Sequence, residues 1–345
     1  MKIAIISDTH FGARGDSPIF LNHFLKFFEE QFFPYLKEHG ITKVIHIGDL
    51  FDRRKFVNFN TLHHVKKRFI KWFDENGVQL HCILGNHDVF YKNTNRLNSP
   101  KEIMGDCYTG FHLYEDTQEV CFNGATILMV PWINEENRDR FMQKIADTKA
   151  TILVGHLELS GYEVMPGVNF GDGMSDKFLE KFDLVLTGHF HKKSSKGNVH
   201  YLGTQYQMTS IDTNETKGFH ILNTETRELQ FISNPLKMFH NIEWRNGTLI
   251  QDFDPAKYKG TYVKVIVYEK KSEIKFDQFL DSLYAVEPAN VSIIEDLSDK
   301  TKEDAELDIS EDTLSLINRE IDGMGTDNPE ELKNIVREIY MESLD

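Results

Sequence analysis

Short apolar runs recur along the first half of the chain, and a polar residue that can bind a metal follows each of five of them. The runs occupy residues 3–6, 44–47, 80–84, 152–154 and 184–186. Runs of this length, bounded by glycine and polar residues, predict buried strands of a layered α/β sheet. In such sheets the ligand crevice lies at the carboxyl ends of the strands. We therefore expect the polar residues after the runs to face one crevice.

The residues that follow the runs select a chemistry. They are two aspartates, one asparagine and four histidines, namely Asp8, His10, Asp49, Asn86, His156, His189 and His191. Oxygen and nitrogen donors without cysteine suit a hard-to-borderline divalent ion such as manganese, iron or zinc. Seven donors are too many for one tetrahedral ion and fit two ions that share a carboxylate. Paired ions about 3.5–4 Å apart stabilise the attacking and the leaving oxygen of a displacement at phosphorus, which predicts phosphate ester hydrolysis.

Each motif alone has an ordinary structural explanation. A histidine after an apolar run is more often a core or surface residue than a ligand, and an aspartate there is more often a turn residue or a helix cap. Five such motifs in order, all at predicted strand ends, favour the metal site.

Five short segments resemble the signature motifs of the calcineurin-like metallophosphoesterases. They are Asp8-Thr9-His10, Gly48-Asp49-Leu50-Phe51-Asp52, Gly85-Asn86-His87-Asp88, Gly155-His156 and Gly188-His189-Phe190-His191. The second segment, together with Tyr201-Leu202-Gly203-Thr204, is similar to the SbcD-like branch of DNA repair nucleases, to which a phage recombination endonuclease subunit is related. The resemblance covers roughly residues 1–210 and implies an α/β fold, a four-layer α-β-β-α metallophosphoesterase sandwich.

The resemblance also implies a role for each motif residue. Asp8, His10, Asp49 and His191 would hold one ion and Asp49, Asn86, His156 and His189 the other, so that Asp49 bridges. His87 would project toward the substrate and assist phosphate charge or leaving-group protonation. Two roles are possible for Asp52: it either orients His87 or serves as a loop carboxylate or helix cap. Asp88 is expected to support the loop or a ligand rather than bind metal. The expected ions are two Mn²⁺, with Fe²⁺, Zn²⁺ or Mg²⁺ as alternatives.

Composition shifts divide the chain into three parts. Residues 1–232 are the expected nuclease domain: helical spacing of apolar residues predicts helices within 18–38 and 58–75, and alternation within 120–132 and 199–231 predicts a second sheet. Residues 233–298 predict a small α+β unit with strands at 262–268 and 291–294 and a helix at 274–285. The nuclease branch implies a capping domain there, and a plain packing domain is the alternative.

Residues 299–345 are expected to form an acidic linker and a helical appendage. Two short helical patterns, led by Leu314 and Leu332, follow the acidic stretch 297–309. Helices this short are not stable alone, so they either fold back on the body or dock on a partner. The linker favours the partner, which the resemblance identifies as a coiled-coil, SMC-like ATPase subunit. It also implies a homodimer through helices near 57–75 and 99–107.

The net charge of −15 is unevenly distributed. Residues 300–345 carry 5 basic and 14 acidic residues, a net of −9, which leaves −6 for residues 1–299. Basic residues follow two of the motifs, and Arg53, Arg54 and Lys92 are candidate contacts to a DNA backbone. A solvent-exposed face is the alternative for the further basic run at 66–68.

Cysteine usage and hydropathy bear on location. Cys82, Cys107 and Cys121 form neither an even disulfide set nor a close-spaced zinc motif, which predicts a reducing cytoplasm. No run approaches 18 apolar residues, and a strand is expected directly after the first two residues. We therefore expect no membrane span and no signal peptide.

The donor set predicts phosphate ester hydrolysis, and the resemblance implies a two-metal-dependent DNA nuclease with exonuclease and single-strand endonuclease activity, acting beside the ATPase in recombination or repair. A phosphatase or cyclic-nucleotide phosphodiesterase of the same fold and a non-catalytic scaffold are the alternatives. The complete ligand set argues against a scaffold. The capping unit and the amphipathic tail argue against a small-molecule phosphatase, which needs neither.

Overall fold

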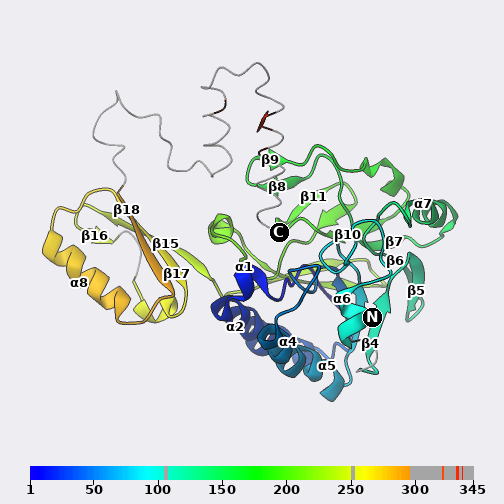
Figure 1. The fold of residues 1–345 in the computed structure, drawn as a ribbon, viewed down its shortest axis with the longest axis horizontal. Coiled ribbons are helices and arrows are strands. Elements are labelled where there is room, and N and C mark those ends of the chain that lie inside the picture. The colour runs from blue at the N-terminus through cyan, green and yellow to red at the C-terminus, as the bar shows by residue number, and fades with distance from the viewer. Residues whose placement is uncertain (105–107, 250–252, 296–320, 322–331, 334–335, 337–345) are drawn as a thin grey trace. The chain divides into compact units, whose positions relative to one another are not determined.

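The computed structural model of the chain describes residues 1–104, 108–249, 253–295, 321, 332–333 and 336 (Figure 1). The chain packs as two units, Met1–Phe239 and His240–Asp345. The expected acidic linker, nearly all of the expected tail helices and Cys107 lie outside the described residues. Within the described part, Cys82 and Cys121 are free thiols, and no helix is long and apolar enough to cross a membrane.

Two six-stranded mixed sheets form the body of the first unit. The first runs in the order β14 (Leu229–Ser233), β13 (Gly218–Asn223), β1 (Lys2–Ile6), β2 (Lys43–Ile47), β3 (Gln79–Ile83) and β4 (Phe111–Tyr114). The second runs in the order β11 (Ser194–Lys196), β12 (Val199–Tyr201), β10 (Leu184–Gly188), β7 (Ile152–His156), β6 (Ala125–Val130) and β5 (Gln118–Phe122). Neighbours are parallel from β1 to β4 and from β12 to β6, so these strands end at common edges.

The two sheets face each other across an apolar core. Ile5 of the first sheet and Val154 of the second belong to one buried cluster. Leu153 points the opposite way, because successive side chains of a strand alternate between faces, and it joins Phe141 of α7 (Arg138–Asp147) in a separate cluster. This alternation yields four layers and confirms the predicted sandwich.

Helices cover the outer faces of the sandwich. In Figure 1, α2 (Pro18–Phe27), α4 (Phe59–Val65) and α5 (Lys71–Glu75) lie together along one side, and α7 lies beside β6 and β7. Single π-helical turns, Phe28–Phe32 and Lys66–Ile70, continue α2 into α3 (Phe33–Glu38) and α4 into α5. The buried rings of Phe28 and Phe69 lie 4.5 Å apart between their centroids, so the predicted aromatic faces do pack together. The remaining elements are α1 (Ala13–Asp16), α6 (Ser99–Met104), the 3₁₀ turns Asp176–Leu179 and Ser210–Asn214, and the hairpin β8 (Glu163–Met165) and β9 (Val168–Asn169).

One sequence prediction about the sheets is wrong. Alternation within residues 199–231 indicated strands of the second sheet, yet β13 pairs antiparallel with β1 and β14 with β13. Both strands therefore extend the first sheet, and only β12 of this region belongs to the second. A period of two residues identifies a half-buried strand, but it carries no information about which sheet receives it.

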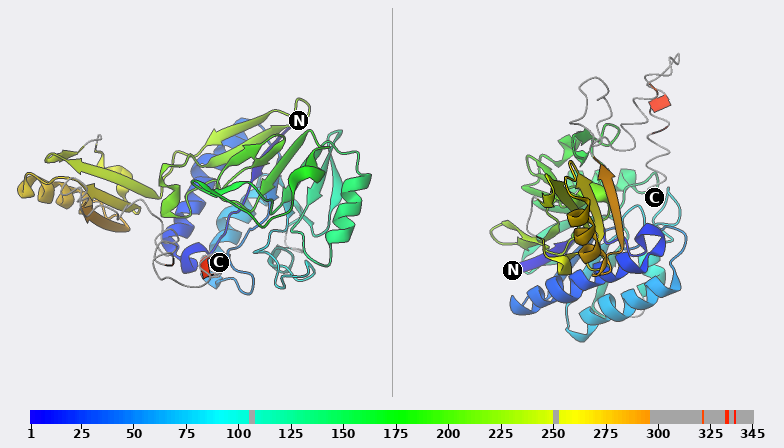
Figure 2. Two further views of the ribbon diagram at one scale, coloured as in Figure 1. Left: turned by 90° about the horizontal axis from the view of Figure 1, so that it is seen from above. Right: turned by 90° about the vertical axis from the view of Figure 1, so that its left-hand side faces the viewer.

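The second unit is a small α+β fold. Its sheet runs in the order β16 (Thr248–Leu249), β15 (Phe239–Arg245), β17 (Tyr262–Val267) and β18 (Asn290–Glu295). Helix α8 (Glu273–Tyr284) covers one face of this sheet (Figure 2), with Phe276 and Phe279 packed on Trp244 and Val265, and a 3₁₀ turn spans Pro255–Tyr258. The strands and helix expected in this region are confirmed to within two residues.

Candidate metal centre

All seven predicted ligands converge at one edge of the sandwich. They follow or end β1, β2, β3, β7 and β10, so both sheets contribute. Asp8, His10 and His191 form one group and Asp49, His156 and His189 another, and within each group the potential ligand atoms lie within 4.8 Å of one another. The expectation of a single crevice at the strand ends therefore agrees with the structure.

The first group places two ring nitrogens face to face. His10 Nε2 and His191 Nε2 are 3.0 Å apart, and Asp49 Oδ2 lies 3.5 Å from His10 Nε2. Asp8 is fully buried and accepts a hydrogen bond from the Ser7 hydroxyl. Its carboxylate also accepts from the backbone N–H of His189, at 3.1 Å to Oδ1, which ties the loop after β1 to the loop after β10.

The second group brings an amide oxygen and two ring nitrogens together. His156 Nδ1 lies 2.8 Å from the carbonyl oxygen of Ile47, which can only accept, so Nδ1 carries the proton. Nε2 of His156 lies 3.0 Å from Asn86 Oδ1 and is then the nitrogen that would give up its proton to bind a cation. His189 Nδ1 lies 3.0 Å from the same oxygen. An amide oxygen and two ring nitrogens thus converge in a buried site, and with both nitrogens deprotonated these residues fit a divalent ion.

Asp49 lies between the two groups. Its Oδ2 is 3.5 Å from His10 Nε2 and 3.4 Å from His156 Nε2, while Oδ1 accepts the backbone N–H of His87 at 2.8 Å. Burial raises the pKa of Asp49, but the nearby charges of His156 and His87 outweigh burial and hold that pKa well below its ordinary value. The carboxylate is thus ionised and within reach of both groups.

The backbone at this edge is unusual. Four of the seven candidate ligands have positive φ: Asp8 at 48°, His10 at 41°, Asp49 at 57° and His189 at 86°. Residues other than glycine rarely adopt this left-handed backbone conformation. Those that do are concentrated at functional sites, where the surrounding structure holds them in place. The clustering of these conformations at the strand ends marks the same edge as the ligand chemistry does.

Two glycines of the motifs make room for the ligands. A Cβ at Gly85 would collide with Asp49 Oδ1, and a Cβ at Gly188 would lie 2.8 Å from Asp8 Oδ2 and closer still to the Ser7 hydroxyl. Neither contact is sterically allowed for carbon. The glycine that precedes a ligand in these motifs therefore permits close approach of the backbone to a carboxylate that follows another strand.

His87 and Asp52 interact, but through the backbone. His87 Nδ1 donates to the Asp52 carbonyl oxygen at 2.6 Å, and this bond holds the ring. The Asp52 carboxylate instead faces the other histidine, with Oδ1 3.4 Å from His10 Nδ1. Of the two alternatives for Asp52, the structure does not show its carboxylate orienting His87: the carbonyl group contacts the His87 ring, and the carboxylate faces His10.

Asp88 braces the ligand loops. Its fully buried carboxylate accepts backbone N–H groups from Asp49, Leu50 and Gly85 at 2.8, 2.9 and 2.8 Å. Burial and the charge of Asp49 raise the pKa of Asp88 to about 6, although the backbone donors oppose this rise. The side chain points into the loops that carry Asp49 and Asn86, in keeping with the expected supporting role.

Sequence reasoning missed three residues near the centre. Glu158 Oε1 lies 3.4 Å from His189 Nε2, and the ring of Trp132 lies 5.4 Å from that of His189. Buried His46 contacts the Thr9 hydroxyl through Nε2 at 2.9 Å, and burial lowers the pKa of His46 to about 3. The signal for Glu158 is its position two residues after His156, on the same side of an extended chain. Trp132 follows β6 at the same edge of the sheet.

The three candidate DNA contacts differ in their surroundings. Arg53 pairs with Asp16 at 3.2 Å, and its guanidinium lies 4.8 Å from the centre of the Phe56 ring. Arg54 is partly buried. Lys92 is exposed and lines a cavity that also contacts His156. Of the three, the structure brings Lys92 to the rim of the metal centre most directly.

The motifs and their geometry match a known family. The model of the calcineurin-like phosphoesterases matches residues 1–193, more than half of the chain. The chain belongs to this family. It is 31% identical over 311 residues to exonuclease subunit 1 of Enterobacteria phage T4, with 88% of each chain covered. It is 24% identical over 246 residues to the SbcD component of the nuclease SbcCD of Staphylococcus epidermidis, covering 68% of this chain and 60% of the relative.

Family membership confirms several sequence predictions. The chain resembles the SbcD-like nuclease branch, its enzyme class is that of metal-dependent phosphoester hydrolases, and its fold is that of the family. The family uses divalent metal ions, and the described Asp and His groups suit them. Both relatives are named as subunits, so they work within larger complexes.

Proposed function

We propose that the protein is a two-metal-dependent DNA nuclease. The observation that carries the proposal is the position of Asp49 Oδ2, within 3.5 Å of a nitrogen from each ligand group. Asp8, His10, Asp49 and His191 would hold one ion, and Asp49, Asn86, His156 and His189 the other. We propose Mn²⁺, because the mixed carboxylate, amide and imidazole donors without thiolate suit a borderline ion that accepts oxygen readily. When bound, paired ions supply an activated water and neutralise charge on the phosphate.

The protein's own residues would position the substrate and move a proton. The bond from His87 Nδ1 to the Asp52 carbonyl leaves Nε2 as the titrating nitrogen of that ring. His87 is 9% exposed and its ring centre lies 4.8 Å from that of His10, so it borders the first ligand group. From there a proton on Nε2 can pass to the oxygen that leaves phosphorus. Asp88 and Asp52 keep the ligands in place during this transfer.

DNA is favoured over a small phosphate ester by the extent of the similarity. The match to the phage exonuclease subunit covers 88% of this chain, so it continues well past the family motifs that end at residue 193. A phosphatase of the same fold would need only the metal centre. We propose both exonuclease activity and cleavage of single strands, in recombination or repair.

A side-by-side assay tests the proposal. The purified protein with Mn²⁺ is offered linear duplex DNA, a single-stranded oligonucleotide and p-nitrophenyl phosphate at equal phosphate concentration. We expect shortening of DNA that EDTA abolishes, with the monoester hydrolysed far more slowly. Rapid monoester hydrolysis with intact DNA would support the phosphatase alternative instead.

We propose two kinds of protein partner. The first is a coiled-coil ATPase subunit, bound through residues 310–345, for which the acidic composition of that segment and the subunit names of both relatives are the support. The second is another copy of this chain. Phe56 and Phe59 are 58% and 88% exposed at the start of α4, and such aromatic residues are typical of a covered interface.

Removal of the tail separates catalysis from binding of the ATPase subunit. Truncation after Ser298 removes none of the proposed ligands, so we expect a folded protein that binds metal and still cleaves single-stranded DNA. It should fail to co-purify with the ATPase subunit and lose ATP-stimulated digestion of duplex DNA. The double substitution Ile335→Asp and Ile339→Asp in the full chain should reproduce the loss, because charges are costly to bury in an interface. Normal binding by the truncated protein would contradict the docking role.

A further inference from the structure

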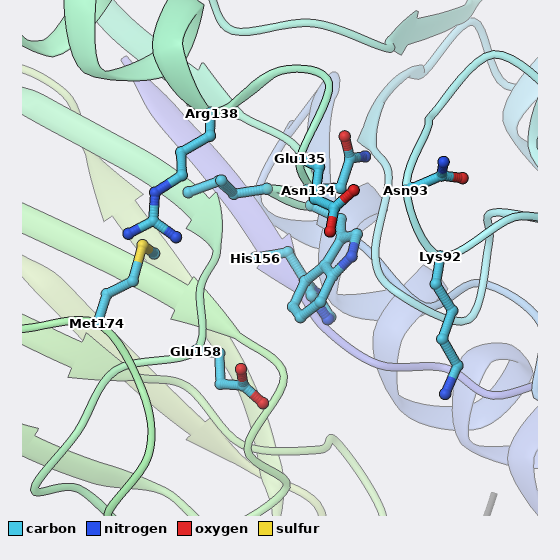
Figure 3. Close-up of a pocket in the computed structure, with 10 residues that line it drawn as sticks. Lys92, Asn93, Asn134, Glu135, Arg138, His156, Glu158 and Met174 are labelled. Carbon is cyan, nitrogen blue, oxygen red and sulfur yellow. The ribbon is translucent and has the colours of Figure 1, made fainter.

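A cavity of about 320 Å³ opens beside the second ligand group (Figure 3). His156 forms part of its wall, and the rest comes from the loops after β3, β6 and β7, the start of α7 and the segment after β9. Ligand pockets in proteins range from about 300 Å³ upward, so this one suits a single small group. The proposed metal ligands and His87 leave this space without a role.

Trp132 forms a fixed wall of the cavity. Its carbonyl oxygen accepts the side-chain amides of Asn95 and Asn137 at 3.1 and 2.8 Å, and its backbone N–H donates to Leu84 at 2.7 Å. Asn134 joins the same network, because its amide donates to Asn95 Oδ1 at 2.8 Å. The indole is only partly buried and lines the cavity. A partly exposed aromatic ring on a well-anchored backbone, beside the proposed metal centre, is suited to stack on a nucleobase.

Cations lie at the two sides of the cavity. Figure 3 shows Arg138 on one side beside Met174 and Lys92 on the other, with the carboxylate of Glu135 between them. Among the described residues, neither Arg138 nor Lys92 makes a side-chain hydrogen bond or ion pair. Nearby arginines do, because Arg140 pairs with Asp116 at 3.2 Å and Arg96 pairs with Glu136.

The acidic residues of the cavity do not cancel these cations. Glu158 Oε1 lies 3.4 Å from His189 Nε2, so this carboxylate faces the metal centre rather than either basic residue. Glu135 is exposed, and Figure 3 shows it between Arg138 and Lys92. The sides of the cavity are thus available to anions, while its wall at Trp132 is aromatic.

We infer that this cavity binds one unpaired nucleotide next to the phosphate that is cleaved, with its base against Trp132 and its flanking phosphate at Arg138 or Lys92. The inference rests on the proposed nuclease function. A cavity of this size admits one nucleotide and excludes a base pair, so the base must leave its stack before cleavage. The enzyme therefore selects frayed ends and single strands through this cavity.

Abasic substrates combined with substitutions at Trp132 test the inference. Single-stranded oligonucleotides carry one abasic nucleotide at each position around the cut in turn. For the unaltered protein, loss of the stacked base should lower kcat/KM about 5- to 100-fold at one position only. Trp132→Ala should lower kcat/KM on the normal strand to a similar extent and remove this positional preference, and Trp132→Phe should restore much of both. A purely structural role for Trp132 would instead reduce cleavage of all strands in equal proportion.

Arg138→Ala and Arg140→Ala are a matched pair on one helix. Arg138→Ala should raise KM for the oligonucleotide and flatten the dependence of log KM on log salt by about 0.7, the slope of one phosphate contact to a single strand. Arg140→Ala, which lies outside the cavity, should leave both unchanged. Cleavage that ignores every abasic position, with equal behaviour of the two arginine variants, would overturn the cavity assignment and leave the nuclease proposal intact. Absence of DNA cleavage by the unaltered protein would instead overturn the function on which the assignment rests.

Discussion

Asp49→Ala is expected to abolish metal binding at both positions together with all phosphodiesterase activity. Asp49 Oδ2 reaches a ring nitrogen of both ligand groups, and no other carboxylate of the described residues does so. Without it each group loses its shared negative charge, and the ions would repel each other unscreened. Elemental analysis and calorimetric titration with Mn²⁺ would report the number of ions bound, and far-UV circular dichroism would report folding.

His10→Ala provides the comparison. His10 belongs to the first group, so its loss should empty that site and leave the site of Asn86, His156 and His189 partly filled. One remaining equivalent in His10→Ala and fewer than one in Asp49→Ala is the expected order. Two tightly bound equivalents in folded Asp49→Ala would show that Asp49 does not bridge.

His87→Ala is expected to retain both ions and lose most of the activity. His87 contributes a backbone N–H to Asp49, which alanine keeps, and its ring is held by the Asp52 carbonyl beside the ligand groups. Removal of a general acid or base costs about 10²–10⁴ in rate. Metal content by elemental analysis and cleavage of an oligonucleotide should therefore diverge in this variant.

Substitution of a histidine that lies outside the motifs is the control for the general effect of removing an imidazole side chain. His39 is exposed and hydrogen bonds to the carbonyl of Tyr35, so His39→Ala should behave like the unaltered protein. If His87→Ala loses an ion along with its activity, the ring is a ligand, as its proximity to His10 and Asp49 would allow. Normal turnover in the variant would exclude both roles.

The ligand set could be predicted because it depends on local order in the chain. A polar residue at or just after the end of a buried parallel strand lies at the carboxyl edge of its sheet. Asp8, Asp49 and His156 all lie there. The role of Asp52 could not be predicted in the same way. Its carboxylate and its carbonyl face different histidines, and only the backbone path between Leu50 and Arg53 decides which.

The pairing of strands that lie far apart in the chain could not be predicted from the sequence either. The apolar alternation of β13 is satisfied equally by either sheet, and it is the antiparallel pairing of His220 with Ile5 that selects the first. Alternation within residues 120–132 predicts a strand that includes Trp132. It does not predict the hydrogen bonds from the side chains of Asn95 and Asn137 that hold the Trp132 carbonyl group. The pairing of β13 with β1 and the contact of Asn95 with Trp132 join segments far apart in the chain, which local sequence patterns do not predict.

The left-handed backbone at Asp8, His10, Asp49 and His189 limits which side chains this centre can recruit. Aspartate, asparagine and histidine are several-fold enriched at positive φ among residues other than glycine, and all three donate oxygen or nitrogen. Cysteine and glutamate are not among the residues enriched at positive φ. The backbone conformation at these four positions thus favours oxygen and nitrogen ligands, which bind hard and borderline ions, over the sulfur ligands that soft ions prefer. A lineage in which these positions drift toward cysteine would have to rebuild the loops as well as the ligands.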